Sequence, residues 1–115
     1  MDVPERATVT PVSELRRSPR AALFEGGDRA PISIFVTTYE EGRGPDLHLH
    51  PYPEVFLVET GTARFTVGDE QLLVEAGHIV TVDAETPHRF KNAGAETLNV
   101  VSVHPSPEVR QTNLE

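Results

Sequence analysis

The sequence predicts an all-β protein, a sandwich or barrel of short strands. Ten prolines and eight glycines are spread over 115 residues, so the chain is interrupted too often for long helices. Between these interruptions lie short runs rich in β-branched and aromatic residues, such as ISIFVTTY at 32–39 and ARFTV at 63–67. Short strands separated by frequent turns are typical of sandwiches and barrels. A chain of this length has room for one domain.

The beginning of the chain is its least regular part. Three prolines interrupt the first twenty residues, and residues 13–17 have room for only a short helical turn. We expect residues 1–30 to form an N-terminal arm that packs on the barrel or on a partner protomer. The barrel itself is expected over residues 31–108, followed by a C-terminal tail over residues 109–115.

Seven strands are expected within the barrel. Each is a run of apolar, β-branched or aromatic residues that ends at a glycine, a proline or a cluster of small polar residues. They are expected at residues 32–39, 54–59, 63–67, 71–74, 79–82, 88–90 and 97–103.

One of these strands indicates an assembly. Residues 55–58 are apolar on both faces of the strand, whereas a sheet with one face in water should alternate. If Phe56 and Val58 face the interior, Val55 and Leu57 need another cover. The N-terminal arm or a second protomer can provide it, and we expect a homodimer.

The composition excludes several classes of function. The formal net charge is −8 and the pI is near 5.0, which disfavours nucleic acid or an anionic membrane as a partner. No apolar run approaches the roughly 20 residues that a membrane-spanning helix needs, so we expect a cytoplasmic protein. The chain has no cysteine, which rules out disulfides and thiolate ligands and leaves nitrogen and oxygen to bind any metal ion.

The chemistry is concentrated in residues 42–61, GRGPDLHLHPYPEVFLVETG. Side chains alternate along a strand, so His48 and His50 are expected to point to the same face. Glu54 begins the next strand after a bend at Pro51–Pro53 and can turn back toward them. Two imidazoles and a carboxylate that converge in this way predict three ligands of one divalent metal ion.

A fourth ligand must come from elsewhere, and three further histidines are candidates. His88 follows Pro87, which favours an extended backbone before it and gives the histidine a defined direction. His78 directly follows a turn glycine and is expected to face solvent. His104 has two interpretations: an exposed residue at the end of the last strand, or a hydrogen-bonding or acid–base group that faces the cavity.

The first stretch resembles a motif of the cupin superfamily. That motif is a glycine, five residues, His-x-His, three or four residues, glutamate, six residues and a second glycine. Every position is matched here, by Gly42, His48, His50, Glu54 and Gly61.

A second cupin motif follows in register. It is a glycine, five residues, Pro-x-Gly, two residues, histidine, three residues and asparagine, and Gly77, His88 and Asn92 match it. Asp83 and Glu85 stand where the motif has its proline and its second glycine, two positions that shape a turn and do not bind metal.

The resemblance implies a double-stranded β-helix, the jelly-roll barrel of cupins. It also implies that His48, His50, Glu54 and His88 bind one divalent ion in the mouth of the barrel, which in this family is iron, manganese, zinc, nickel, copper or cobalt. Neutral imidazoles and one carboxylate would leave the site with a net charge of +1. An ion that prefers six ligands would keep open positions for water, O₂ or a chelating molecule.

Several functions are compatible with such a site. The first is an enzyme that acts on a small oxygen-containing molecule, with a dioxygenase reaction as the first hypothesis and isomerisation or epimerisation as an alternative. The second is a non-catalytic module that binds or senses a small ligand. No catalytic residue is assigned: His104, and Glu54 if it detached from the metal, are weak candidates. No organic cofactor is expected.

Overall fold

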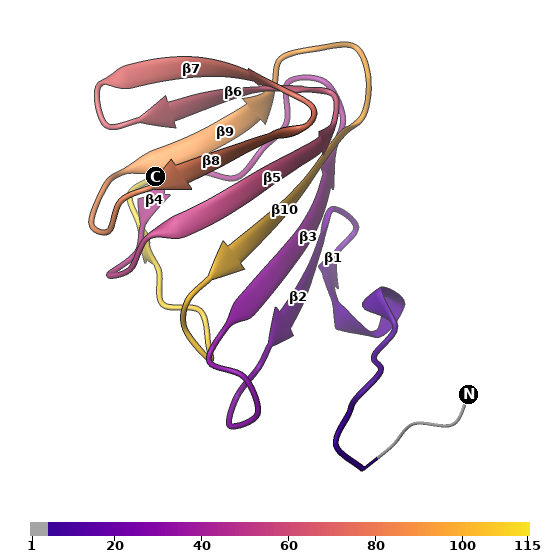
Figure 1. Ribbon diagram of the computed structural model, residues 1–115. Coiled ribbons are helices and arrows are strands. Elements are labelled where there is room, and N and C mark those ends of the chain that lie inside the picture. Colours follow the sequence, from indigo (N-terminus) through magenta and orange to yellow (C-terminus); the bar gives the residue numbers. More distant parts are fainter. Residues whose placement is uncertain (1–4) are drawn as a thin grey trace.

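The computed structural model describes residues 5–115, and in this range the chain forms eleven β-strands and one short 3-10 helix, η1 at Val12–Leu15. The strands make two antiparallel sheets (Figure 1). The first sheet has the order β1 (Arg16–Ser18), β2 (Ala21–Glu25), β3 (Ser33–Tyr39), β10 (Leu98–His104), β5 (Glu54–Thr60) and β8 (His78–Val82). The second has the order β11 (Thr112–Asn113), β4 (His48–Leu49), β9 (His88–Asn92), β6 (Thr62–Val67) and β7 (Glu70–Glu75).

The expected all-β jelly roll is confirmed, and so are its seven strands. Each of them is present, with ends that differ from the sequence prediction by at most two residues. No helix within residues 5–115 has the length and apolar character needed to cross a membrane.

Alternation along the central strands places the core and the site on the same inner face. On β5, Phe56 and Val58 are buried, whereas Val55 and Leu57 are exposed. On β10, every second residue from Leu98 to His104 is buried. These side chains meet those of β6 and β9 from the other sheet and form one apolar core. The polar inward residues lie at one end of the strands, where the site is built.

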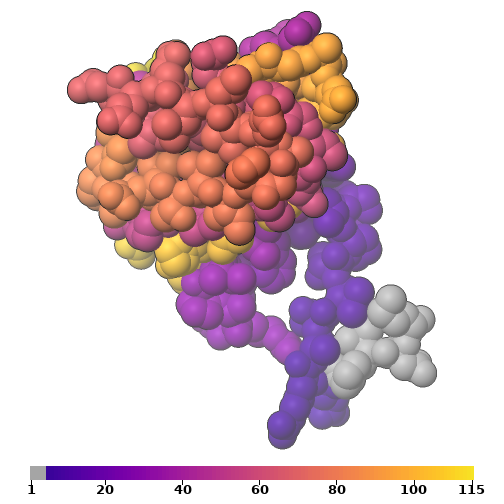
Figure 2. All heavy atoms as spheres, turned by 45° about the horizontal axis from the view of Figure 1, so that its top comes forward, coloured from indigo at the N-terminus to yellow at the C-terminus, as the bar shows by residue number. Residues whose placement is uncertain are grey.

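Three strands were not foreseen. β1 and β2 belong to the expected N-terminal arm and extend the first sheet beside β3, with Leu23 paired to Phe35. The sequence of β2, AALFE, lacks β-branched residues, so its strand conformation comes from pairing with β3 and not from local preference. β11 has two residues and is too short for any pattern. β4 lies where His48 and His50 were expected on a strand, but it ends at Leu49. Residues 5–11, before η1, extend away from the barrel (Figure 2).

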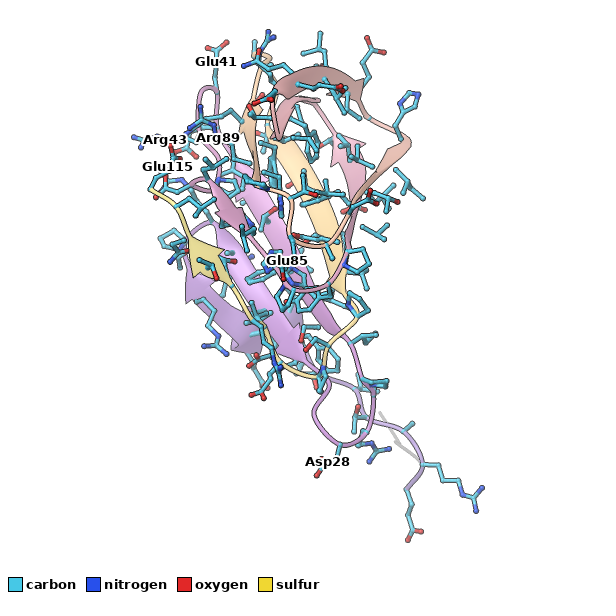
Figure 3. The ribbon with its side chains drawn as sticks, turned by 90° about the vertical axis from the view of Figure 1, so that its left-hand side faces the viewer. Asp28, Glu41, Arg43, Glu85, Arg89 and Glu115 are labelled. Atoms are coloured by element: carbon cyan, nitrogen blue, oxygen red, sulfur yellow. The ribbon has the colours of Figure 1, made fainter. Side chains whose placement is uncertain are left out.

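The turn between β8 and β9 keeps an unusual backbone conformation despite its altered sequence. Glu85 has φ of +60° and is the only non-glycine residue with positive φ in the part of the chain that the structure describes. Glu85 lies in the middle of the view in Figure 3. Its N–H donates to the carbonyl of His50 at 2.7 Å, which ties the turn to a candidate ligand. The left-handed conformation is therefore retained at a position where the cupin motif has glycine.

Replacing Glu85 with glycine should stabilise the protein. A side chain in the left-handed region costs about 1–2 kcal/mol, and the substitution removes this strain. Glycine also has greater freedom in the unfolded chain, which offsets only part of the stabilisation. We expect Glu85→Gly to raise the melting temperature by about 2–4 °C in differential scanning calorimetry. Glu85→Ala is the matched control, since it removes the carboxylate but keeps Cβ, and should bring no such gain. A lower melting temperature for the glycine variant would contradict the interpretation.

Candidate metal centre

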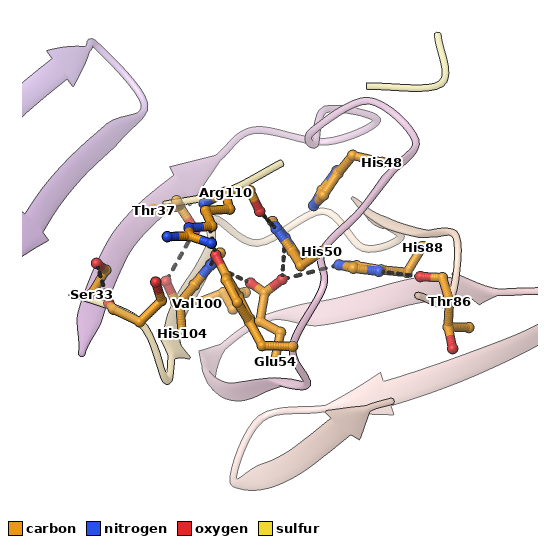
Figure 4. A network of polar contacts seen from close by, with 12 residues as sticks. Ser33, Thr37, His48, His50, Glu54, Thr86, His88, Val100, His104 and Arg110 are labelled. Carbon is orange, nitrogen blue, oxygen red and sulfur yellow. Dashed lines mark hydrogen bonds and ion pairs between the residues drawn. The ribbon is translucent and has the colours of Figure 1, made fainter. Parts of the chain in front are cut away.

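Four side chains converge at one end of the barrel. His48, His50, Glu54 and His88 are all buried, and their potential ligand atoms lie within 4.8 Å of one another (Figure 4). They come from β4, the segment after it, β5 and β9. His48 and His88 are directly paired across β4 and β9. The structure therefore brings together all four ligands that the sequence predicted.

Each of the three imidazoles is oriented by a hydrogen bond from its other ring nitrogen. In every case Nδ1 lies within hydrogen-bond distance of a backbone carbonyl oxygen, and because a carbonyl can only accept, Nδ1 carries the proton. The acceptors are the carbonyls of Asp46 for His48 at 2.6 Å, Arg110 for His50 at 2.7 Å and Thr86 for His88 at 2.8 Å. In the neutral rings, all three Nε2 atoms therefore present a lone pair.

Two of these Nε2 atoms lie against the carboxylate of Glu54. Its Oε1 lies 3.0 Å from Nε2 of His50 and 3.0 Å from Nε2 of His88. Nε2 of His50 lacks the angle of a hydrogen bond and has no partner among the described residues, whereas Nε2 of His88 has hydrogen-bond geometry. With the proton of each neutral ring on Nδ1, nitrogen lone pairs and a carboxylate converge, which is the donor set of a metal site. The residues present thus fit a divalent ion.

The charge state of the site supports the same conclusion. Burial lowers the pKa of His48 below its ordinary value, so this ring is neutral and able to coordinate at neutral pH. Burial acts in the opposite direction on Glu54, but the contacts of His104, His50 and His88 with its carboxylate outweigh that effect and hold the pKa of Glu54 far below its usual range. Glu54 is therefore ionised.

The side chain of His104 points to the inner face of the barrel and contacts the second carboxylate oxygen of Glu54. Its side chain is 1% exposed, and Nε2 lies 3.0 Å from Glu54 Oε2, although the ring is not aligned for a straight hydrogen bond. Nδ1 lies 2.7 Å from the hydroxyl of Tyr52, which accepts from the N–H of Arg110 at 3.1 Å. Of the two interpretations of His104, the structure shows the inward one. The participation of Tyr52 was not foreseen.

Residues of the C-terminal tail hold the candidate ligands in position. The sequence did not indicate these contacts. The carbonyl of Arg110 orients His50, and β11 pairs with β4 so that Asn113 lies opposite His48. Glu115 accepts from the N–H of Leu47 at 2.7 Å and pairs with Arg89 at 2.9 Å. Arg89 and Glu115 lie beside each other in Figure 3. No motif marks these residues, because most of them act through backbone groups or chain ends.

A cavity of about 280 Å³ opens beside the cluster. His48 and Glu54 form part of its wall, and so do Phe56 and Phe90, the two aromatic residues that strand alternation places near the site. His78, in contrast, is exposed and donates to the carbonyl of Glu75 at the start of β8. It takes no part in the cluster.

Loss of one ligand should abolish tight metal binding without unfolding the barrel. We expect His88→Ala to weaken the affinity for Mn²⁺ or Co²⁺ by about 100-fold or more, measured by isothermal titration calorimetry on metal-free protein. His78→Ala is the matched control, because it removes an exposed histidine and should leave the affinity unchanged. Equal affinities for the two variants would show that the cluster does not hold the ion.

The cupin domain family is the one whose sequence model matches this chain, over residues 35–104. No curated protein sequence matches it. Among solved structures, that of Bacillus subtilis oxalate decarboxylase at pH 4.6 is similar with a TM-score of 0.79 and 22% identity, over 90% of this chain and 30% of that one. Another structure of the B. subtilis enzyme, studied for its Mn(II) centres, has a TM-score of 0.76 and 22% identity over 85% and 29%.

A third similar structure is the formate complex of Lactobacillus farciminis oxalate decarboxylase, with a TM-score of 0.76 and 19% identity over 89% of this chain and 34% of that one. The chain thus spans about a third of the length of these enzymes. At such low identity, they support the fold alone. The family match covers more than half of the chain and includes all four ligand positions. The chain belongs to the cupin family.

Proposed function

We propose that this protein binds a divalent transition metal and uses it to act on a small oxygen-containing molecule, with a dioxygenase reaction as the first hypothesis. In such a reaction both atoms of O₂ enter the substrate. The residues that would hold the ion are His48, His50, Glu54 and His88. Iron or manganese bound there would supply an open position for O₂ or a chelating substrate.

The position of the cavity is the observation that carries this proposal. Two of the four ligands, His48 and Glu54, also line the cavity of about 280 Å³. A molecule in the cavity would therefore lie directly against the ion, with no protein layer between them. A metal ion that served only to stabilise the fold would be expected in a closed site without an adjoining cavity.

The contacts of the acidic and basic groups favour oxygen chemistry over isomerisation. Isomerisation or epimerisation requires a free base that removes a proton from carbon. Glu54 contacts imidazoles with both of its oxygens, and His104 is held between Glu54 and Tyr52. Glu54 and His104, the two residues considered as catalytic groups from the sequence, are therefore both engaged in other contacts. A dioxygenase reaction makes smaller demands on such groups because the metal and O₂ supply most of the chemistry.

The similar solved structures are those of oxalate decarboxylases, but the cavity of this chain is poorly suited to oxalate. None of the described residues that line it is lysine or arginine, whereas Asp46 and Glu115 both contribute to its wall. Because Glu115 is paired with Arg89, a dianion would meet the carboxylate of Asp46, which is unpaired within residues 5–115, and only the single net positive charge of the metal site. Coulomb repulsion in a partly buried cavity is screened less than in water, so these charges matter.

Oxygen consumption tests the proposed reaction. We would load the metal-free protein with Fe²⁺ or Mn²⁺ and follow O₂ with an electrode in the presence of catechol, lactate, pyruvate or oxalate. We expect O₂ uptake in proportion to the loss of one of these compounds, and none with His88→Ala. Substrate conversion without O₂ uptake would favour an isomerase. Metal-dependent binding without any turnover would favour a non-catalytic sensor, and either result would overturn the dioxygenase hypothesis.

We also propose that the protein is a homodimer. Val55, Leu57 and Ile79 form an apolar strip on the outer face of β5 and β8, with exposed fractions of 36%, 38% and 67%. Leu57 and Ile79 lie opposite each other in the pairing of the two strands. The N-terminal strands β1 and β2 lie at the other edge of this sheet, so they leave the strip uncovered. A second copy of the chain is the cover that remains.

A charge within the strip should dissociate this dimer. By light scattering at micromolar concentration we expect twice the mass of one 12.6 kDa chain for the wild type and a single chain for Ile79→Glu. Leu73→Glu is the matched control: Leu73 is 59% exposed on β7, in the other sheet, and its substitution should leave the dimer intact. A monomeric wild type would contradict the proposal.

A further inference from the structure

Much of the cavity wall is aromatic. Phe35, Tyr39, Phe56 and Phe90 all contribute to it. Phe90 meets Tyr39 edge to face, with ring centroids 5.7 Å apart, and meets Phe56 in the same manner at 5.8 Å. Because these rings hold one another in place, they offer fixed edges and faces against which a planar ring can pack.

The size of the cavity suits a small ligand. Its volume of about 280 Å³ is at the lower end of the range for small-molecule sites. A six-membered ring with two or three substituents has about ten non-hydrogen atoms and can be accommodated in this space.

The charges around the cavity limit the ligand to one negative charge. With a divalent ion, neutral imidazoles and ionised Glu54, the centre carries +1, which a monoanion neutralises. No lysine or arginine of the described chain lines the cavity. Two nearby cations are already paired, Arg89 with Glu115 and Arg20 with Glu40. A second negative charge on the ligand would thus remain uncompensated beside Asp46, which has no such partner among the described residues.

A hydroxyl in the wall favours a ligand that donates hydrogen bonds. Oγ1 of Thr37 donates its proton to the carbonyl of Val100 at 3.0 Å, and Thr37 lines the cavity. With its proton committed, this oxygen can only accept from a bound molecule. A ligand with a phenolic O–H meets this requirement, whereas a fully ionised carboxylate does not.

From these observations we propose that the cavity binds a small aromatic molecule with two adjacent oxygen donors and at most one negative charge, and that it discriminates against aliphatic dicarboxylates. The two oxygens would reach the metal ion on the side of His48 and Glu54, while the ring packs against Phe35 and Phe90. The inference deepens the proposed function and rests on it, because it requires a metal ion in the centre.

The test compares two chelating probes on the same metal-loaded protein. After calorimetry has established the binding of Co²⁺, catechol and oxalate are titrated separately without oxygen, and binding is followed by the visible absorption of the cobalt ion. We expect catechol to bind about tenfold or more tightly than oxalate. Equal binding, tighter binding of oxalate, or binding of neither probe would overturn the proposed ligand class while leaving the metal centre intact. Failure to bind Co²⁺ would overturn the proposed function as well.

Three variants separate the contributions of the ring and of the charges. Phe35→Leu should weaken the binding of catechol several-fold without changing the affinity for Co²⁺. Its matched control is Phe24→Leu, since Phe24 lies on the opposite face of the sheet, near η1, and should have no effect. Asp46→Asn should strengthen the binding of oxalate more than that of catechol, because the dianion is repelled more strongly by the Asp46 carboxylate, while the backbone carbonyl that orients His48 is retained. A Phe35→Leu variant that bound catechol as the wild type does would overturn the aromatic part of the proposal.

Discussion

The buried negative charge of Glu54 is the constraint on which the rest of this structure depends. Its side chain is almost fully enclosed, and all of its nearest polar neighbours are imidazoles. A carboxylate in such surroundings is costly unless a positive charge lies beside it. Three of the imidazoles keep a proton on Nδ1 against a backbone carbonyl, so in its neutral form each presents a lone pair on Nε2. A metal ion bound by these lone pairs would supply the positive charge beside Glu54, and the ends of β4, β5 and β9 are arranged to hold one.

The sequence was sufficient for the strands that carry most of the core and for the ligands. Strand alternation predicts that His48 and His50 share a face, and the match to the two cupin motifs adds His88 to these residues and Glu54. These features are local: each depends on a few consecutive residues whose pattern is visible in one dimension. The exposed position of His78 follows in the same way from the glycine before it.

The parts that could not be predicted depend on partners distant in the chain. β2 is a strand because β3 is beside it, and β11 has too few residues to show a pattern. His104 turns inward because β10 ends next to Glu54, which the sequence leaves open. Likewise, no side-chain motif indicates that the backbone carbonyl of Arg110 orients His50. Contacts made through the backbone carry almost no signature in a single sequence.

The distance along the chain between His50 and its partner at position 110 has a consequence for how the protein is made. During synthesis the ligands His48, His50 and Glu54 leave the ribosome long before the segment that fixes them. His88 follows later, and β10, which carries His104, comes after it. Until residue 110 has emerged, the imidazole of His50 can rotate and adopt either tautomer. The four candidate ligands can therefore be held together in their final orientation only after residue 110 has left the ribosome.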